Sequence, residues 1–367
     1  MAGRPTIGRS TELPHILVTG GAGFIGGNFV LRWLADPAAD GIINVDKLTY
    51  AGHRATLAGV DLDPRHRLFQ VDICDAAALH ELFSKYRPRA LVHFAAESHV
   101  DRSIEGPAAF IQTNLVGTFT LLEVARAYWQ ALDAAGKAAF RFLHVSTDEV
   151  FGSLASGDPC FSETAPYRPN SPYSASKAGA DHLVRAYHRT YGLPVVTANC
   201  SNGYGPYQFP EKLIPKIITG GLAGKPLPIY GDGLNVRDWL FVGDLCAALR
   251  EILANGRIGD SYNVGGGNER SNLEIAHALC GLLDELRPRK KGSYCEQIRF
   301  VEDRPGHDRR YALDASKIRR ELGWEPQVPF DSGLRSTVRW FLDNPEWVKA
   351  ALQGEEPAGA SAERHVS

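Results

Sequence analysis

The sequence lacks the features that mark membrane, secreted and nucleic-acid-binding proteins. No apolar run approaches the length of a membrane-spanning helix, and no signal-peptide core follows the first residues. The six cysteines form no C-x-x-C pair, which favours free thiols in a reducing cytosol. The 40 Lys and Arg residues nearly balance 42 Asp and Glu residues, so nothing suggests a nucleic-acid or membrane partner. We therefore expect a cytoplasmic globular protein, and we expect no metal site.

Short apolar runs alternate with helical patterns in the first part of the chain. The predicted strands are His15–Thr19, Ile42–Asp46, Arg67–Asp72, Ala90–Ala95, Phe140–Ser146 and Pro194–Asn199. Helical patterns lie between them, as at Ala76–Tyr86 and Thr113–Ala134. This alternation predicts an α/β fold with a Rossmann-type doubly wound parallel sheet.

Beyond Cys200, prolines and glycines become frequent and strands no longer alternate with helices, which indicates a smaller second domain. The runs Arg237–Val242 and Ser261–Val264 are expected to return to the first domain. We predict a sheet domain at 14–200 plus about 235–264, and a discontinuous C-terminal substrate domain at 201–234 and 265–345. Residues 1–13 and 352–367 are expected to be disordered.

The motif Gly20-x-x-Gly23-x-x-Gly26 lies between the first strand and a helical pattern. Such glycines permit a tight turn, close approach of a pyrophosphate and close packing of helix on strand. Asp46 ends the second strand, where a carboxylate would bind a ribose diol and repel a 2'-phosphate. Taken alone, the glycines could form a purely structural turn, and Asp46 could be a turn or cap residue. Together they predict that the sheet domain binds NAD rather than NADP.

Two further strand ends carry weaker signals. Asp72 follows the third strand, where an adenine edge could be read, although a lone Asp there is as often a helix cap. Ala95 and Ala96 follow the fourth strand, and small residues let backbone pass close to a cofactor. Glu97 and His99 could equally be solvated loop groups.

Tyr173 and Lys177 have the spacing that places two side chains on one face of a helix. An ammonium beside a phenol favours the phenolate, a base that can take a proton from an alcohol while hydride leaves carbon. Thr147 ends the preceding strand and could bind the same hydroxyl. The Tyr and Lys pair is common by chance, but its place downstream of a dinucleotide motif gives it weight.

Asp148 and Glu149 follow directly, at the sheet edge where such folds place their active sites. Two carboxyl groups in one site of low dielectric tend to have separated pKa values, which yields an acid and a base. The alternative is an exposed acidic turn.

From His15 to about Trp340 the sequence resembles the extended short-chain dehydrogenase/reductase superfamily, and within it the dTDP-glucose 4,6-dehydratase family. The resemblance is carried by Thr19–Gly26, Ala95–Ser103, Ser146–Gly152, Tyr173–Lys177, Tyr204–Pro215, Asn268–Asn272 and Asp303–Tyr311. The glycine motif and the Tyr/Lys pair mark the superfamily, whereas the Thr-Asp-Glu triplet and the last three segments are more specific. Gly203 departs from the family pattern, which usually has a second Asn at this position.

The resemblance implies a role for each matching position. Tyr173 would be the base for oxidation at C4, Lys177 would hold the nicotinamide ribose, and Thr147 would orient the 4-hydroxyl. Glu149 would remove the C5 proton, and Asp148 would protonate the departing 6-hydroxyl.

Two larger sets of binding residues are expected. Those for the cofactor are Gly20, Gly23, Phe24, Ile25, Gly26, Asp46, Lys47, Thr49, Asp72, Ile73, Ala95, Ala96, Ser98, Thr113, Tyr173 and Lys177. Those for the nucleotide sugar are Ser98, His99, Thr147, Asn202, Glu211, Lys212, Leu213, Pro228, Tyr230, Arg237, Asn272, Arg304 and His307. The Arg and Lys residues in the second set suit phosphate oxygens.

The implied protein is a homodimeric, NAD-dependent lyase of deoxysugar biosynthesis that converts dTDP-glucose to dTDP-4-keto-6-deoxyglucose plus water. Broad apolar faces on Thr113–Leu132 and Ser174–Tyr191 support the dimer. The alternatives are a UDP-glucose 4,6-dehydratase, a 4-epimerase or a UDP-sugar decarboxylase of the same fold. An epimerase would not need the two carboxyl groups as an acid–base pair.

A regulatory protein with an inactive site is a further alternative, but it would be expected to lose Tyr173, Lys177 or the two carboxyl groups. Thymine and uracil differ by one methyl, worth only about 1 kcal/mol, so the sequence does not decide the base. Nor does it decide between surface rhamnose and a secondary-metabolite sugar as the end product.

Overall fold

The computed structural model describes residues 14–353, and the predictions for residues 1–13 and 354–367 lie outside this range. Its main sheet has seven strands in the order β3-β2-β1-β4-β5-β6-β10, and all the pairs are parallel. The strands are β1 (His15–Thr19), β2 (Gly41–Asp46), β3 (His66–Gln70), β4 (Ala90–His93), β5 (Arg141–Thr147), β6 (Val195–Cys200) and β10 (Ser261–Val264). The predicted doubly wound Rossmann-type sheet is confirmed.

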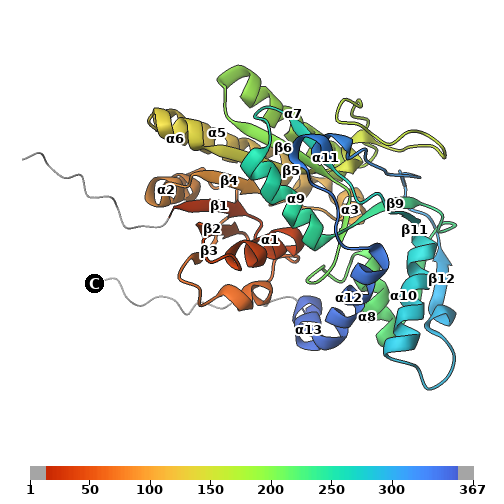
Figure 1. The fold of residues 1–367 in the computed structure, drawn as a ribbon. Helices are drawn as coiled ribbons and strands as arrows, with labels where there is room; N and C mark the ends of the chain where they lie inside the picture. Colours follow the sequence, from red (N-terminus) through yellow and green to blue (C-terminus); the bar gives the residue numbers. More distant parts are fainter. Residues whose placement is uncertain (1–13, 354–367) are drawn as a thin grey trace, which may run out of the picture.

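Successive side chains of each strand point to opposite faces of the sheet, and both sets are apolar, so helices cover both faces. In β1, Ile16 and Val18 pack with α1 (Phe24–Leu34) and α9 (Val242–Asn255), which lie in front of the sheet in Figure 1. Leu17 faces the other side. There the apolar residues come from α2 (Ala76–Tyr86), α5 (Thr118–Ala131) and α7 (Pro172–Tyr191).

A smaller lobe lies beside the main sheet and has its own apolar core. Its helices are α8 (Leu213–Leu222), α10 (Asn272–Leu286), α12 (Phe330–Asp343) and α13 (Pro345–Gln353), grouped at the lower right of Figure 1. It contains a three-stranded sheet of β7 (Asn202–Tyr204), β9 (Val236–Phe241) and β11 (Glu269–Ser271), and a pair of β8 (Leu227–Tyr230) and β12 (Ile298–Val301).

Two expectations need correction here. The segment Arg237–Val242 was expected to return to the first domain, but β9 pairs with β7 and β11 instead, although its Leu240 and the following Val242 pack in the core of the main sheet. The predicted tail begins two residues too early, because α13 extends to Gln353 and buries Ala351 against the second core.

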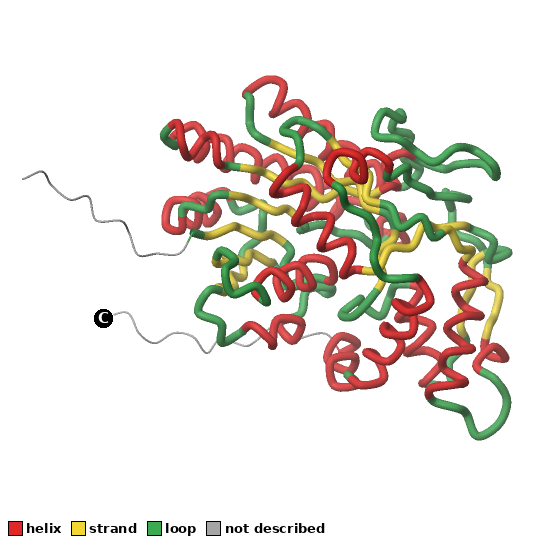
Figure 2. Tube along the Cα trace, in the orientation of Figure 1, coloured by secondary structure: helices red, strands yellow, loops and turns green. Residues whose placement is uncertain are grey.

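Shorter elements connect these units. They are η1 (Arg54–Val60), α3 (Val100–Glu105), α4 (Pro107–Phe110), η2 (Ile111–Gly117), α6 (Ala134–Ala139), η3 (Asp148–Phe151), η4 (Tyr294–Gln297) and α11 (Ser316–Leu322). Figure 2 shows that loop and turn structure fills the stretch between η3 and α7. α7 begins sharply because Ser171 and Ser174 form a capping box and Pro172 occupies the first turn.

The sequence predicted no segment long and apolar enough to span a membrane, but one helical run in the structure meets that description. Pro107–Ala131 is long and apolar enough to cross a membrane by length and composition alone. This is weak support for a membrane span, because a core helix passes the same test. Within the run, Leu121, Leu122 and Val124 are buried in the cluster that joins α2, α5 and α7.

Candidate active site

The candidate site lies at the carboxyl ends of β1 and β4, where the strand order reverses and such folds place ligands. A cavity of about 300 Å³ lies there, and a second of about 180 Å³ adjoins it toward the smaller lobe. The residues that line both cavities are Ser98, Glu149, Asn202, Gly203, Gln208, Glu211 and Lys212. The two hollows are therefore parts of one continuous cleft.

All sixteen residues predicted for the cofactor line the first cavity. Gly20 has a φ of +73°, which favours glycine, and a Cβ at Gly26 would lie 2.2 Å from the carbonyl oxygen of Gly20. Gly23 is the N-cap of α1 and stays open, since a Cβ there would meet only the Gly20 oxygen, at 3.4 Å. The backbone thus forms a bare turn at a helix N-terminus, which is suited to a pyrophosphate.

Asp46 fixes this turn to the end of β2. Its Oδ2 accepts from the N–H of Ala22 at 2.9 Å, and its Oδ1 accepts from the N–H of Leu48 at 2.8 Å. Burial raises the pKa of Asp46, although these backbone hydrogen bonds oppose the rise. A carboxylate offers about four lone-pair sites, so Asp46 can hold the turn and still accept from a ligand hydroxyl. The cap alternative and the ribose prediction are thus compatible.

The weaker strand-end signals have structural partners. Asp72 accepts from the N–H of Cys74 and pairs with Lys47 at 2.7 Å, so it closes a turn while it lines the first cavity. The side chain of His99 accepts from the N–H of Arg102 as the N-cap of α3. Glu97 is tied through its backbone to Asn114, a residue that the sequence analysis missed.

Tyr173 and Lys177 lie on one face of α7, both buried, and both line the first cavity. The pKa relationship predicted for them does not hold in this structure. Burial and the charge of Glu149 hold the pKa of Tyr173 well above its usual value. Burial lowers the pKa of Lys177, whose Nζ donates to the carbonyl of Val145 at 2.8 Å. The ammonium is thus directed to β5, and it does not dominate the surroundings of the phenol.

Asp148 and Glu149 do not form an exposed acidic turn. They belong to η3, whose N-cap is Thr147, and the side chain of Asp148 is 1% exposed. Burial, then Glu149 and Asp238, raise the pKa of Asp148 well above its usual value. Burial also raises the pKa of Glu149, but nearby cations oppose this rise. The charges that surround the two neighbouring carboxyl groups therefore differ.

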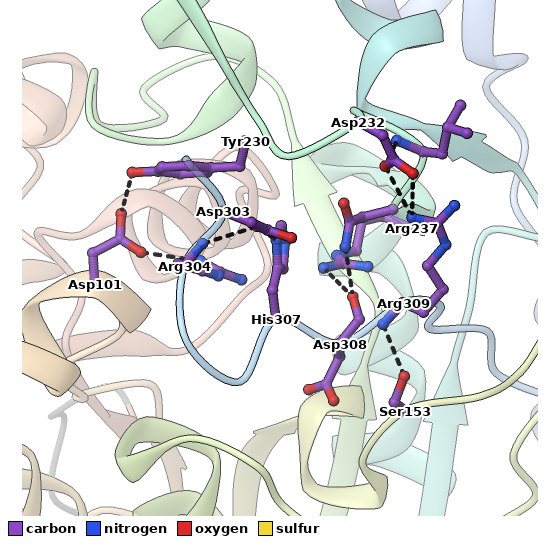
Figure 3. A network of polar contacts seen from close by, with 12 residues as sticks. Asp101, Ser153, Tyr230, Asp232, Arg237, Asp303, Arg304, His307, Asp308 and Arg309 are labelled. Carbon is purple, nitrogen blue, oxygen red and sulfur yellow. Dashed lines mark hydrogen bonds and ion pairs between the residues drawn. The ribbon is translucent and has the colours of Figure 1, made fainter. Parts of the chain in front are cut away.

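Basic side chains converge on the second cavity from several elements. Lys212, Arg237, Arg304 and His307 all line it, and Figure 3 shows the last three in one polar network. Arg237 donates to the carbonyl of Asp308 at 3.0 Å, and His307 pairs with Asp303 at 2.5 Å. This arrangement suits an anion with several oxygen atoms. Among residues 14–353, no group of three or more His, Cys, Asp or Glu residues could hold a metal ion.

Several buried polar atoms in the cleft have no hydrogen-bond partner within the described chain. They are Asp148 Oδ2, Asn202 Oδ1, Gln208 Oε1, Trp239 Nε1 and Arg304 Nε, and each residue lines one or both cavities. Buried polar groups are rarely left unpaired unless a ligand or water satisfies them. These atoms therefore indicate where a polar ligand would bind.

Comparison with known proteins fits this cleft. The family profile described as GDP-mannose 4,6 dehydratase matches residues 17–337. A "dTDP-glucose 4,6-dehydratase" from Xanthomonas campestris pv. campestris (strain B100) is 60% identical over 339 residues, which cover 92% of this chain and 96% of the relative. The chain belongs to the dTDP-glucose 4,6-dehydratase family.

Solved structures agree with this family. The DesIV dTDP-glucose 4,6-dehydratase from Streptomyces venezuelae, with NAD and TYD bound, has a TM-score of 0.83 and 50% identity. The match covers 92% of this chain and 99% of that chain. A UDP-glucose 4-epimerase from Thermus thermophilus, in complex with NAD, has a lower TM-score of 0.78 and 31% identity, over 90% of this chain and 99% of that one.

The cleft brings together all the residues predicted for this family and adds others. Thr147 lines the first cavity, and the other twelve predicted nucleotide-sugar residues line the second. Asp101, Gln208, Trp239 and Tyr311 also line it and were missed. None of them has a distinctive spacing in the sequence. Gly203 has room for a side chain, since an added Cβ would meet Leu245 only at 3.4 Å.

Behind the cleft lies a buried polar cluster that the sequence analysis also missed. Asp181 accepts hydrogen bonds from Ser146 at 2.7 Å and Tyr167 at 2.9 Å, and it contacts His144 at 2.9 Å. Burial raises the pKa of Asp181, but these partners outweigh it and the net shift is downward. This cluster fixes α7, and with it Tyr173 and Lys177, against the end of β5.

Proposed function

We propose that this protein is an NAD-dependent hydro-lyase that converts dTDP-glucose to dTDP-4-keto-6-deoxyglucose plus water. The observation that carries the proposal is the pairing of Asp148 and Glu149 at the junction of two cavities. One carboxyl group lies in surroundings that favour its acid form, and the other lies beside cations. Elimination of water needs such a pair, because a proton must leave C5 while another reaches the 6-hydroxyl.

The first cavity fits NAD. The open turn at Gly20–Gly26 would take the pyrophosphate, Asp46 would accept from a ribose hydroxyl, and Lys177 would hold the nicotinamide ribose. Bound NAD would supply the hydride acceptor for oxidation at C4 and, once reduced, the hydride for C6, so the cofactor would be regenerated. No net oxidation results, and the enzyme is a lyase despite its dehydrogenase fold.

The chain's own groups would carry the proton transfers. Tyr173, next to Thr147, would take the proton of the 4-hydroxyl. The resulting C4 ketone makes the C5 proton acidic, so Glu149 could remove it. Asp148 would protonate the departing 6-hydroxyl, and its buried acid form suits this step. Burial and the charge of Glu149 raise the pKa of Tyr173, so the phenol is protonated in the structure without ligands.

The second cavity would bind the nucleotide diphosphate. Arg237, Arg304 and Lys212 supply positive charge, and Asn202 and Asn272 supply amide groups. The unpartnered Nε of Arg304 and Oδ1 of Asn202 are buried atoms that such a ligand would satisfy. In this arrangement the main sheet unit holds the cofactor, and Arg237 from β9 joins residues of segments 201–234 and 265–345 to hold the nucleotide.

We further propose a cytoplasmic homodimer that serves deoxysugar biosynthesis. All six cysteines are free thiols, in keeping with a reducing compartment. Exposed apolar side chains gather on η2, α5 and the end of α7, where Ile111, Phe119 and Tyr191 are 43%, 45% and 45% exposed. Such a patch is typical of a subunit interface.

Product analysis tests this proposal. Purified enzyme would be incubated with dTDP-glucose and, separately, with UDP-glucose, and the products would be identified by mass spectrometry and NMR. The expected product from dTDP-glucose is about 18 mass units lighter, because one molecule of water is lost. An isomer of unchanged mass would instead favour a 4-epimerase, and faster turnover of UDP-glucose would reassign the nucleotide.

A further inference from the structure

Asp101, on α3, makes two contacts across the cleft that no catalytic or ligand-binding role accounts for. Its Oδ2 accepts from the hydroxyl of Tyr230 at 3.0 Å, and its Oδ1 accepts from Nη1 of Arg304 at 3.2 Å. Figure 3 shows Asp101 between these two side chains. The ring of Tyr230 in turn meets the ring of His307 edge-on, with centroids 6.2 Å apart. One carboxylate thus supports three residues that line the second cavity.

These contacts join segments that are distant in the sequence. α3 follows the loop after β4, which carries Ala95, Ala96 and Ser98 into the first cavity. Tyr230 ends β8, and Arg304 follows β12, the parallel partner of β8. Asp101 therefore ties the wall of the cofactor cavity to the loop that carries Arg304 and His307 into the nucleotide cavity.

The contact with Asp101 also determines which edge of the Arg304 guanidinium is free. Asp101 takes Nη1, whereas Nε is buried and has no partner in the described part of the chain. Guanidinium groups bind phosphates best through two N–H groups on one edge. With Nη1 held, the edge that carries Nε stays available for a ligand.

We propose that Asp101 is a positioning residue for the nucleotide diphosphate, which it serves by holding Arg304 and Tyr230 in their binding orientation before substrate arrives. The inference deepens the proposed function and rests on it. Asp101 does not touch the phosphates itself. Its influence passes through Arg304, so it affects ligands that carry a diphosphate and spares those that lack one.

The charge of Asp101 is compatible with this role. Burial raises its pKa, but the hydrogen bond from Tyr230 and the charge of Arg304 outweigh this, and the net shift is downward. Asp101 is therefore ionised at neutral pH and its charge is matched by Arg304. The pair is partly shielded, with side-chain exposures of 29% for Asp101 and 20% for Arg304, so water does not fully screen it.

The test compares two ligands on holoenzyme carrying Asp101→Ala or Asp101→Asn. Calorimetry would measure binding of dTDP, which has the diphosphate, and of thymidine, which does not. For Asp101→Ala we expect dTDP to bind about tenfold more weakly, the scale of one charge-assisted hydrogen bond, with thymidine unchanged. Asp101→Asn should lie between wild type and Asp101→Ala. In turnover, KM for dTDP-glucose should rise while kcat stays within about twofold of wild type.

Asp232→Asn is the matched control, since it also removes a carboxylate that pairs with an arginine of the same loop. Asp232 pairs with Arg309 at 2.9 Å, but both side chains are about half exposed and neither lines the cavity. Figure 3 shows both pairs, one on either side of His307. We expect wild-type affinity for dTDP in Asp232→Asn.

A double mutant tests whether the effect of Asp101 on dTDP binding passes through Arg304. In an Arg304→Ala background, Asp101→Ala should have little further effect on dTDP binding, because its partner is gone. Equal affinity of wild type and Asp101→Ala for dTDP would overturn the inference and leave the proposed function standing. So would an equal loss for dTDP and thymidine, which would indicate a general structural role. Failure of the wild-type protein to bind dTDP would overturn both.

Discussion

Asp148 and Glu149 are consecutive residues of one helical turn, yet different sets of charges act on their carboxyl groups. Asp148 is affected by burial and then by the carboxylates of Glu149 and Asp238, all of which raise its pKa. Glu149 is also buried, but Arg304, Arg237 and Lys212 oppose the rise in its pKa. Three cations thus oppose the rise in the pKa of Glu149, whereas Arg237 alone opposes that of Asp148.

This difference predicts that Asp148→Asn and Glu149→Gln will block elimination without blocking oxidation at C4. Both changes preserve shape and remove a proton-transfer group, which is typically worth about 10²–10⁴-fold in rate. Hydride should still leave C4, so absorbance of the reduced nicotinamide should accumulate in a rapid-mixing experiment. In heavy water, Glu149→Gln should exchange hydrogen at C5 far more slowly than it reduces the cofactor. Wild-type turnover in both variants would contradict this division of labour.

The pH dependence of elimination should follow from the same pair. The rate should rise as Glu149 loses its proton and fall as Asp148 loses its own at higher pH, since the base must be ionised and the acid protonated. Asp148→Asn should be slower but should lose the falling limb. The measurement is the single-turnover rate at which dTDP-4-keto-6-deoxyglucose forms, determined across a range of pH. A falling limb that persisted in Asp148→Asn would assign it to another group.

Tyr173→Phe should abolish oxidation at C4 and leave nucleotide binding nearly intact, because only the phenolic oxygen is removed. No absorbance of reduced nicotinamide should appear on mixing with substrate, and dTDP should bind with wild-type affinity in calorimetry. Tyr128→Phe serves as the control, since it also removes a phenol, one that donates to the carbonyl of Pro88 and does not line the cleft. Keto-sugar formation at the wild-type rate in Tyr173→Phe would rule out the assigned base.

The sequence predicted the main sheet well because its signals are local. Each predicted strand of the first part of the chain is present, and the glycine turn follows β1 as expected. The pairing of β9 was not predicted, because strand pairing depends on partners distant in sequence, here β7 and β11. Nothing within Arg237–Val242 distinguishes one sheet from the other.

The residues of the cleft also divide into those that a local spacing predicts and those that depend on partners distant in the sequence. The Tyr173 and Lys177 spacing is local, so both could be named, but the pKa of Tyr173 could not. It depends on burial, on Glu149 and on where the Lys177 Nζ finds an acceptor, which is the Val145 carbonyl of a neighbouring strand. Arg304 could be named only through the family resemblance, because an isolated arginine has no spacing that distinguishes it from a surface charge.

The proposed dimer predicts that Phe119→Asp will shift the protein from dimer to monomer. Phe119 is 45% exposed at the start of α5, and a carboxylate in an apolar interface would lose its hydration without a partner. Light scattering after gel filtration would report the mass, with Leu62→Asp as a control at a site that is 97% exposed elsewhere on the molecule. A monomeric wild type, or a dimer that persisted in Phe119→Asp, would contradict the interface.

Asp46→Ala should narrow the preference for NAD over NADP and also destabilise the fold. The carboxylate at the end of β2 repels a 2'-phosphate. Two unit charges 4 Å apart interact by about 1–4 kcal/mol between bulk water and a protein surface. The ratio of the affinity for NAD to the affinity for NADP should therefore fall by about tenfold or more. The same carboxylate accepts from the N–H groups of Ala22 and Leu48, and unpaired buried donors cost about 1–3 kcal/mol each. Asp46→Asn separates the effects, because it removes the charge and keeps one acceptor. Its ratio of NAD affinity to NADP affinity should approach that of Asp46→Ala, while its midpoint of thermal unfolding stays nearer to that of the wild type. A wild-type cofactor ratio in both variants, with only the stability changed, would mean that Asp46 serves the turn alone.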